Sequence, residues 1–232
     1  MSNYIFPAAE IPSVPVRGQS ARYAVSRIFC VGRNYAAHAR EMGSDPTREP
    51  PFYFAKPASA IAFSGTTIPY PSATQNLHYE MELVIAIGAP VFKVTPEAAR
   101  AAVWGYAAGL DMTRRDLQNE AKKIGRPWDT GKGFENSAVI TELIRVQDVG
   151  WLDKGAITLA VNGTEKQRGD LSDMIWNVPE IVANLSQYFH LQAGDLIYTG
   201  TPEGVGPVVA GDVITGRIEG LVDLQVTIGA AD

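Results

Sequence analysis

Two glutamates with the spacing of neighbours on a β-strand are the first chemical signal in the sequence. Residues 77–88 (LHYEMELVIAIG) alternate polar and apolar side chains and then become wholly apolar, which is typical of a strand that begins at a polar rim and ends in the core. Glu80 and Glu82 therefore point to the same side, with Cβ atoms about 6.6 Å apart. Carboxylates this close repel each other when both are ionised, so the pair predicts a site for a hard divalent cation.

The alternative is an exposed strand face on which both glutamates are solvated. The apolar run 83–87 directly after the pair implies burial and favours the metal site. His78 is in phase with the glutamates, but it lies about 13 Å from Glu82 along the strand and cannot bind the same ion. The pattern therefore does not predict an iron site with a histidine ligand.

A histidine and a glutamate three residues apart form the second signal. His38 and Glu41 fall in a predicted short helix, 35–42, which Asn34 is expected to cap and Gly43 to end. Residues i and i+3 share a helix face, so the carboxylate can hold the imidazole in one tautomer and stabilise its protonated form, as a general base requires. On an exposed helix the same pair is usually only a solvated surface, and the local sequence leaves both possibilities open.

More polar groups follow the next apolar strand, 106–110. Asp111 comes at the end of this strand, where ligands often collect, and a helix begins soon after it. One face of that helix could meet an anion, and it carries Arg115, Gln118 and Lys122; a solvated helix surface is the alternative. The stripe of the helix that is expected to be buried consists of Leu117, Ala121 and Ile124.

Glycines flank a further candidate, Lys132, just before another apolar strand. Two glycines let the backbone approach a ligand closely, although the lysine fits a loop charge equally well. The segment is not a Walker nucleotide-binding loop, because the required glycine spacing and the following Ser or Thr are missing. Near the C-terminus, Gly204 and Gly206 predict a tight turn whose backbone amides could hold a carboxylate.

Length and composition limit the possible classes of protein. The 232 residues are expected to form one domain, 25–232, after an extended arm, 1–24, that contains three prolines. The net charge of −5, with acidic and basic residues interspersed, gives no footprint for nucleic acid. No apolar run is long enough to span a bilayer and no signal-peptide pattern is present, so a cytoplasmic protein without membrane contact is expected. Cys30, the single cysteine, lies in an apolar strand and is not expected to be a nucleophile.

Beyond residue 156 the sequence predicts mostly strands. Residues 157–161 and a return strand form a hairpin around Asn162 and Gly163. One amphipathic helix, 179–189, follows this hairpin. The remaining strands are expected at 196–199, 213–218 and 221–228.

The order of these residues resembles one known enzyme family. The series is Cys30-Val31-Gly32-Arg33-Asn34-Tyr35 with His38 and Glu41, then Glu80-Met81-Glu82, Asp111, Arg115-Asp116-Leu117-Gln118, Lys132 and Thr199-Gly200-Thr201-Pro202. Over nearly the whole chain after about residue 25, it resembles the fumarylacetoacetate hydrolase superfamily, and within it the small bacterial fumarylpyruvate hydrolases and acylpyruvases. The resemblance implies an α+β fold, a mixed β-sheet roll with short peripheral helices, and commonly a homodimer.

The resemblance also implies roles for single residues. It implies one Mg²⁺ or Mn²⁺ ion held by Glu80, Glu82 and Asp111. It implies a catalytic pair formed by His38 and Glu41. The substrate contacts that it implies are Arg115, Gln118, Lys132 and Thr201.

Hydrolysis of a carbon–carbon bond in a 2,4-dioxo acid is the reaction that fits these roles. The favoured substrate is fumarylpyruvate, which would give fumarate and pyruvate in the last step of gentisate breakdown. His38 would take a proton from the attacking water, while Lys132 would stabilise the departing pyruvate enolate. The distal carboxylate of the substrate requires one more cation, for which Arg33 and Arg126 are both candidates.

Other functions remain open on the sequence alone. Members of the same superfamily decarboxylate or tautomerise oxaloacetate, or isomerise or hydrate related 2-oxo acids. A protein of another class, a non-catalytic and metal-dependent binder of dicarboxylates, would need the same ligands. The His38 and Glu41 pair favours hydrolysis, because a decarboxylase needs no activated water.

Residues 35–48 are predicted to form a lid over the bound substrate. The helix that carries His38 has about two turns, and the loop 43–47 has little apolar content to anchor it. In a hydrogen-exchange experiment, the amides of 35–48 should exchange quickly without ligand and slow markedly with magnesium and oxalate. Residues 83–87 should stay protected in both states. Equal protection of 35–48 in both states would mean that His38 belongs to a preformed site.

Overall fold

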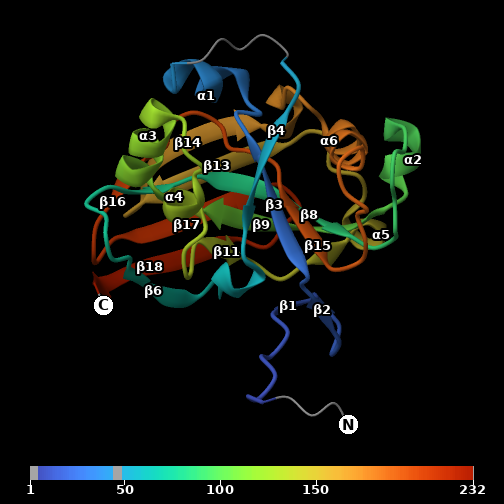
Figure 1. The fold of residues 1–232 in the computed structure, drawn as a ribbon, viewed down its shortest axis with the longest axis horizontal. Coiled ribbons are helices and arrows are strands. Elements are labelled where there is room, and N and C mark those ends of the chain that lie inside the picture. Colours follow the sequence, from blue (N-terminus) through green and yellow to red (C-terminus); the bar gives the residue numbers. More distant parts are fainter. Residues whose placement is uncertain (1–4, 44–48, 232) are drawn as a thin grey trace.

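The structure, a computed structural model, describes residues 5–43 and 49–231. Its largest element is an eight-stranded mixed sheet, which crosses the centre of the molecule in Figure 1. The main path of this sheet runs through β4 (Phe52–Lys56), β3 (Arg27–Gly32), β15 (Asp195–Tyr198), β8 (Met81–Ile87), β9 (Val103–Asp111), β11 (Ala138–Ile140) and β5 (Ile61–Phe63), and β12 (Ile144–Arg145) pairs with β9 beside it. Most neighbours are antiparallel, but β15 is parallel to β3 and β11 is parallel to β5.

Two further sheets complete the half-barrel. The five-stranded sheet has the order β14 (Thr164–Asp170), β13 (Ala156–Val161), β17 (Val213–Ile218), β18 (Leu224–Ala231) and β6 (Thr66–Tyr70). The three-stranded sheet has the order β10 (Thr113–Arg114), β7 (Leu77–Tyr79) and β16 (Gly206–Val208). Apolar side chains from the five-stranded and eight-stranded sheets, among them Leu159, Val226 and Ile85, form one buried cluster, so the two sheets share a core.

The helices are short and lie at the periphery of the sheets (Figure 1). They are α1 (Ala36–Glu41), α2 (Pro96–Arg100), α3 (Arg115–Ile124), α4 (Asp129–Lys132), α5 (Val146–Val149) and α6 (Val178–Leu185), with 3-10 turns at Ala58–Ala60 and Leu171–Asp173. The predicted class, a mixed β-sheet roll with short peripheral helices, is confirmed. Within the described ranges no helix is long and apolar enough to cross a membrane.

Strand β8 lies at the centre of the large sheet, between β15 and β9, and all seven of its residues are buried. Side chains alternate across a strand, so Leu83 and Ile85 enter the core shared with the five-stranded sheet, while Val84 and Ala86 enter a second cluster on the opposite face. An apolar run covered on both faces explains why residues 83–87 show no polar alternation. The strand therefore forms a rigid base for Glu82.

The strand expected over 77–88 is interrupted at Glu80. Its first part is β7, in the three-stranded sheet, and its second part is β8, in the eight-stranded sheet. The chain passes from one sheet to the other at Glu80, whose carbonyl oxygen accepts a hydrogen bond from Asp111 N at 2.9 Å. The pattern of alternation was correct, but alternation alone does not reveal that the strand changes its partners.

Two further details of the expected elements were wrong. Asn34 does not cap α1: its side chain donates to the carbonyl oxygens of Trp176 and Thr199 and accepts from Trp176 N, so long-range contacts replace the local cap. Lys132 lies at the end of α4 instead of in a loop. The hairpin around Asn162 is confirmed as β13 and β14.

The N-terminal segment, expected as an extended arm, contains a small antiparallel hairpin. Strand β1 (Ser13–Pro15) pairs with β2 (Arg22–Ala24). Val14 and Val16 are buried, and Val16 forms a backbone bridge with Leu143, so this part of the segment packs on the large sheet. It contributes no side chain to the pocket described below.

Ile85→Ala should destabilise the protein by about 2–5 kcal/mol, because it opens a cavity in the middle of β8. Val209→Ala is the matched control. Since Val209 is 62% exposed, its truncation should change the free energy of unfolding by no more than about 0.5 kcal/mol. Urea unfolding measures both values. Equal effects of the two substitutions would contradict the central position of β8.

Candidate active site

Three carboxylates meet at the start of β8 and the end of β9. Glu80, Glu82 and Asp111 are all buried, and one oxygen of each lies within 4.8 Å of the others. The register explains this meeting, because Met81 pairs with Leu110, which places Glu80 beside Asp111. The sequence predicted these three residues as one group, and the structure brings them together.

Basic side chains from three other elements compensate two of the carboxylates. Lys132 Nζ donates to Glu80 Oε2 at 2.8 Å, to Asp111 Oδ2 at 2.6 Å and to Thr113 Oγ1 at 2.7 Å. Arg115 donates to Glu80 Oε1. Lys56 Nζ lies 2.8 Å from Asp111 Oδ1, an ion pair without the geometry of a hydrogen bond, so this buried oxygen accepts none.

Glu82 is in a different electrostatic environment. Its Oε2 accepts a hydrogen bond from Gly200 N at 2.7 Å, but among the described residues it forms no ion pair. Burial, together with Asp111 and Glu80, raises the pKa of Glu82 well above its usual range. Burial would also raise the pKa of Glu80, but Lys132 and Arg115 hold it well below its usual range. The cluster therefore lacks positive charge specifically at Glu82.

This donor set fits a divalent cation. Three carboxylates that can converge on one point are hard oxygen ligands, the type that Mg²⁺, Mn²⁺ and Ca²⁺ prefer. An ion there would supply the charge that Glu82 lacks and could bind the Asp111 oxygen that accepts no hydrogen bond. His78 stays outside the cluster, as expected: its ring nitrogens contact Arg115 and Asn76, and burial and Arg115 lower its pKa to about 4.

His38 faces the same pocket from α1. The imidazole is buried, and its Nδ1 lies 3.0 Å from Glu41 Oε2. The other oxygen of Glu41 accepts a hydrogen bond from Gly204 N at 3.0 Å. Burial raises the pKa of Glu41, but the bonds from His38 and Gly204 outweigh it and lower that pKa overall. An ionised Glu41 holds the Nδ1 proton, which leaves Nε2 of His38 free to accept a proton.

Helix α3 presents polar groups to the pocket. Arg115 and Gln118 are buried, whereas Ile124, expected in the buried stripe, is 51% exposed. The prediction from apolar periodicity was correct for Ala121, which is buried, but wrong for Ile124, because α3 covers the carboxylate cluster with its polar face. Gln118 Oε1 accepts from Arg115 at 2.6 Å, so its amide Nε2 is left to donate to a ligand.

Thr201 offers a second donor on the opposite side. Its Oγ1 accepts a hydrogen bond from Gln167 Nε2 at 2.9 Å, so the hydroxyl proton is available to a ligand. Gln167 is fixed in turn, because its Oε1 accepts from Met81 N at 3.0 Å. Gln118 and Thr201 thus provide two oriented donors beside the carboxylates.

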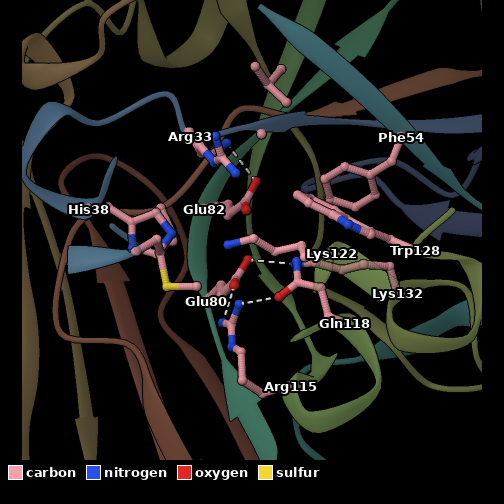
Figure 2. A pocket seen from close by; sticks show the side chains of 15 residues that line it. Arg33, His38, Phe54, Glu80, Glu82, Arg115, Gln118, Lys122, Trp128 and Lys132 are labelled. Atoms are coloured by element: carbon pink, nitrogen blue, oxygen red, sulfur yellow. Dashed lines mark hydrogen bonds and ion pairs between the residues drawn. The ribbon is translucent and has the colours of Figure 1, made fainter. Parts of the chain in front are cut away.

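The pocket also has an aromatic and basic part (Figure 2). Phe54 and Trp128 lie together on one wall, with ring centroids 5.7 Å apart. Arg33 and Lys122 line the same pocket. Arg126, the other candidate for the distal carboxylate, is exposed and lines a different pocket.

Two residues of the site could not be identified from their local sequence. Lys56 ends an aromatic strand, FYFAK, and looks like an exposed charge at a strand end, yet it is buried against Asp111. Gln167 lies in a polar strand whose neighbours are mostly exposed. These two residues could be identified only from the pairing of their strands with strands far away in the sequence. Cys30, by contrast, is buried as expected, and burial raises the pKa of its thiol.

Comparison with known proteins identifies the family. A model described as the C-terminal domain of fumarylacetoacetate (FAA) hydrolase matches residues 27–229. The chain belongs to the fumarylacetoacetate hydrolase family. The match covers every residue of the site described above.

Relatives of this chain include a hydrolase and a tautomerase. A fumarylpyruvate hydrolase of Ralstonia sp. is 55% identical over 188 residues, which cover 81% of this chain and 97% of the relative. The mitochondrial oxaloacetate tautomerase FAHD1 of Homo sapiens is 44% identical over 197 residues, which cover 85% of this chain and 89% of the relative. The crystal structure of fumarylpyruvate hydrolase from Pseudomonas aeruginosa, in complex with Mn²⁺ and pyruvate, has a TM-score of 0.96 and 49% identity and covers 98% of this chain and 100% of that one.

Glu82→Gln should weaken the binding of Mg²⁺ or Mn²⁺ by at least about tenfold, because it removes the carboxylate that lacks a cation partner. The fold should persist, since the substitution also relieves repulsion from Asp111 and Glu80. Calorimetric titration measures the affinity, and thermal melting checks the fold. Glu97→Gln, on the exposed face of α2, is the control. Unchanged ion affinity in Glu82→Gln would remove these carboxylates as the metal site.

Proposed function

We propose that this protein hydrolyses a carbon–carbon bond of a 2,4-dioxo acid, with fumarylpyruvate as substrate and fumarate and pyruvate as products. The observation that carries this proposal is the oriented His38–Glu41 pair in the same pocket as the carboxylate cluster. A base and a cation site that face one cavity are the two parts that such a hydrolysis requires. The Ralstonia and Pseudomonas relatives support the choice of substrate.

The pyruvoyl end of the substrate is proposed to lie over the carboxylates. Glu80, Glu82 and Asp111 would hold Mg²⁺ or Mn²⁺, which, when bound, polarises the 2-oxo oxygen and stabilises developing negative charge. Gln118 and Thr201 each have a donor free for the carboxylate or oxo group of the substrate. The Pseudomonas structure contains pyruvate, one of the two proposed products, together with Mn²⁺.

His38 is the proposed general base. Its Nε2 takes a proton from water, the water oxygen bonds to C4 of the substrate, and the bond between C3 and C4 then breaks. The electron pair of that bond leaves with C3 as the pyruvate enolate, and C3 takes a proton to give pyruvate. Glu41 stabilises the imidazolium that forms in between, because its carboxylate lies 3.0 Å from Nδ1.

Lys132 and Arg115 are proposed to stabilise the enolate by their charge. In this structure the three protons of Lys132 are donated to Glu80, Asp111 and Thr113, so Lys132 positions the carboxylates. A direct bond from Lys132 to the substrate would replace one of these three. Burial lowers the pKa of Lys132, but Asp111 and Glu80 raise it overall, so the side chain remains a cation.

Oxaloacetate tautomerisation is the second candidate, because relatives with that activity are 44% identical to this chain. A dicarboxylate binder without activity would share the same ligands. One assay distinguishes the three: the loss of enol absorbance of fumarylpyruvate, acetylpyruvate and oxaloacetate, with and without Mg²⁺. Metal-dependent cleavage of fumarylpyruvate supports the proposal, whereas turnover of oxaloacetate alone, or of none of the three, contradicts it.

Two further expectations belong to this proposal. Residues 25–232 are proposed to be the catalytic domain, and the active protein is proposed to be a homodimer, as the family resemblance implies. Part of the predicted lid, 44–48, lies outside the described residues, and the remainder, 35–43, contains α1.

His38→Ala should reduce hydrolysis of fumarylpyruvate by at least about 100-fold, because it removes the group proposed to take the proton from water. Binding of oxalate, which resembles the pyruvate enolate, should stay nearly unchanged, since it requires the ion and the donors but no base. Arg40→Ala, an exposed residue of the same helix, is the control and should keep both properties. If His38→Ala loses activity and oxalate binding together, His38 has a structural role instead.

A further inference from the structure

Arg33 and Lys122 are basic side chains of the pocket without an acidic partner. Among the residues that the structure describes, neither forms an ion pair, whereas Arg115 and Lys132 are both paired with the carboxylate cluster. The guanidinium of Arg33 lies over the ring of Phe52, 5.5 Å from its centroid. Two half-buried cations in one pocket therefore remain uncompensated by the described part of the chain.

Lys122 continues the polar row of α3. Residues 115, 118 and 122 share one helix face, and the axial rise from Arg115 to Lys122 is about 10 Å. Arg115 ends at Glu80, so the row starts at the carboxylate cluster and reaches a position beyond it. Figure 2 shows the side chain of Lys122 extending into the pocket, with Arg33 entering from the loop after β3.

The two cations affect each other. Burial, followed by repulsion from Arg33 and Arg115, lowers the pKa of Lys122. The backbone of Arg33 is left-handed, with φ of 56°, a conformation that is uncommon for residues other than glycine. An added Cβ at the preceding Gly32 would lie 2.0 Å from the Phe52 ring, so a side chain there would displace the ring over which Arg33 lies. Arg33 is thus held near Lys122 despite repulsion and an unfavourable backbone, as at many ligand sites.

Aromatic rings occupy the wall of the pocket beside these cations. Phe54 and Trp128 provide flat apolar surface on which a planar unsaturated chain can pack. Arg126 is exposed and lines a neighbouring pocket that shares Phe54 and Trp128 with this one, whereas Arg33 lines this pocket itself, so the geometry favours Arg33.

We propose that Arg33 and Lys122 bind the distal carboxylate of the substrate, while Phe54 and Trp128 contact the unsaturated chain that carries it. This inference rests on the proposed function and deepens it, because it names the residues that recognise the acyl group. The enzyme should prefer 2,4-dioxo acids that end in a second carboxylate over those that end in a methyl group. The end of the pocket at the carboxylate cluster binds the part common to both.

The test compares two substrates that differ at this end. For each variant, kcat/KM is measured with fumarylpyruvate and with acetylpyruvate, and the ratio of the two values is the readout. Arg33→Met and Lys122→Met should each lower this ratio by at least about tenfold, because each removes a charged partner of the distal carboxylate. Lys123→Met, at the exposed neighbour on α3, is the matched control and should keep the wild-type ratio.

The inhibition constants of fumarate and oxalate give a second ratio. This ratio does not depend on turnover of the poorer substrate. Lys122→Met should raise the inhibition constant of fumarate at least about tenfold relative to that of oxalate. Unchanged ratios in both Arg33→Met and Lys122→Met would overturn the inference, as would a ratio that falls only in Arg126→Met. If the unaltered enzyme hydrolyses neither substrate, the proposed function fails first, and that result is seen before any variant is compared.

Discussion

Repulsion among three buried carboxylates is the constraint on which this site depends. Glu80, Glu82 and Asp111 bring oxygens within 4.8 Å of one another in a region that is largely closed to water. Burying one ionised group without compensation costs several kcal/mol, and a shared site raises this cost. Lys132 and Arg115 therefore come from α4 and α3 to neutralise the cluster. Because neither of them pairs with Glu82, whose partner is the Gly200 amide, the described residues alone do not complete the compensation.

The parts of the site that the sequence predicted depend on short spacings. A period of two residues places Glu80 and Glu82 on one side of the chain, and a spacing of three places His38 beside Glu41. Both relations survive in the structure, even though the strand is divided at Glu80. The mixed sheet with short helices was predicted from the resemblance to the family.

The parts that the sequence did not predict depend on strand order. Lys56 reaches Asp111 only because β4 pairs with β3, and 55 residues separate the two side chains along the chain. Periodicity assigned the buried face of α3 from its apolar residues, but carboxylates on the facing element made Arg115 the buried side chain. Asn34 had the chemistry of a helix cap, yet two distant carbonyl groups bind it. The chemistry of a side chain limits which groups it can bind, and the tertiary fold determines which of those groups lies next to it.

One loop after β15 connects the His38–Glu41 pair to the carboxylate cluster. Gly200 N donates to Glu82 at 2.7 Å, and four residues later Gly204 N donates to Glu41 at 3.0 Å. Both glycines have positive φ, and an added Cβ at Gly204 would lie 2.1 Å from a backbone oxygen, so this path of the loop requires glycine. Glu82 and Glu41 are thus each held by a backbone amide. Unlike a side-chain donor, a backbone amide has no rotamers that must be restricted. The separation between Glu41, the partner of His38, and Glu82 is therefore set by the backbone of a single loop, while α1 itself, with six residues, is too short to hold His38 in place alone.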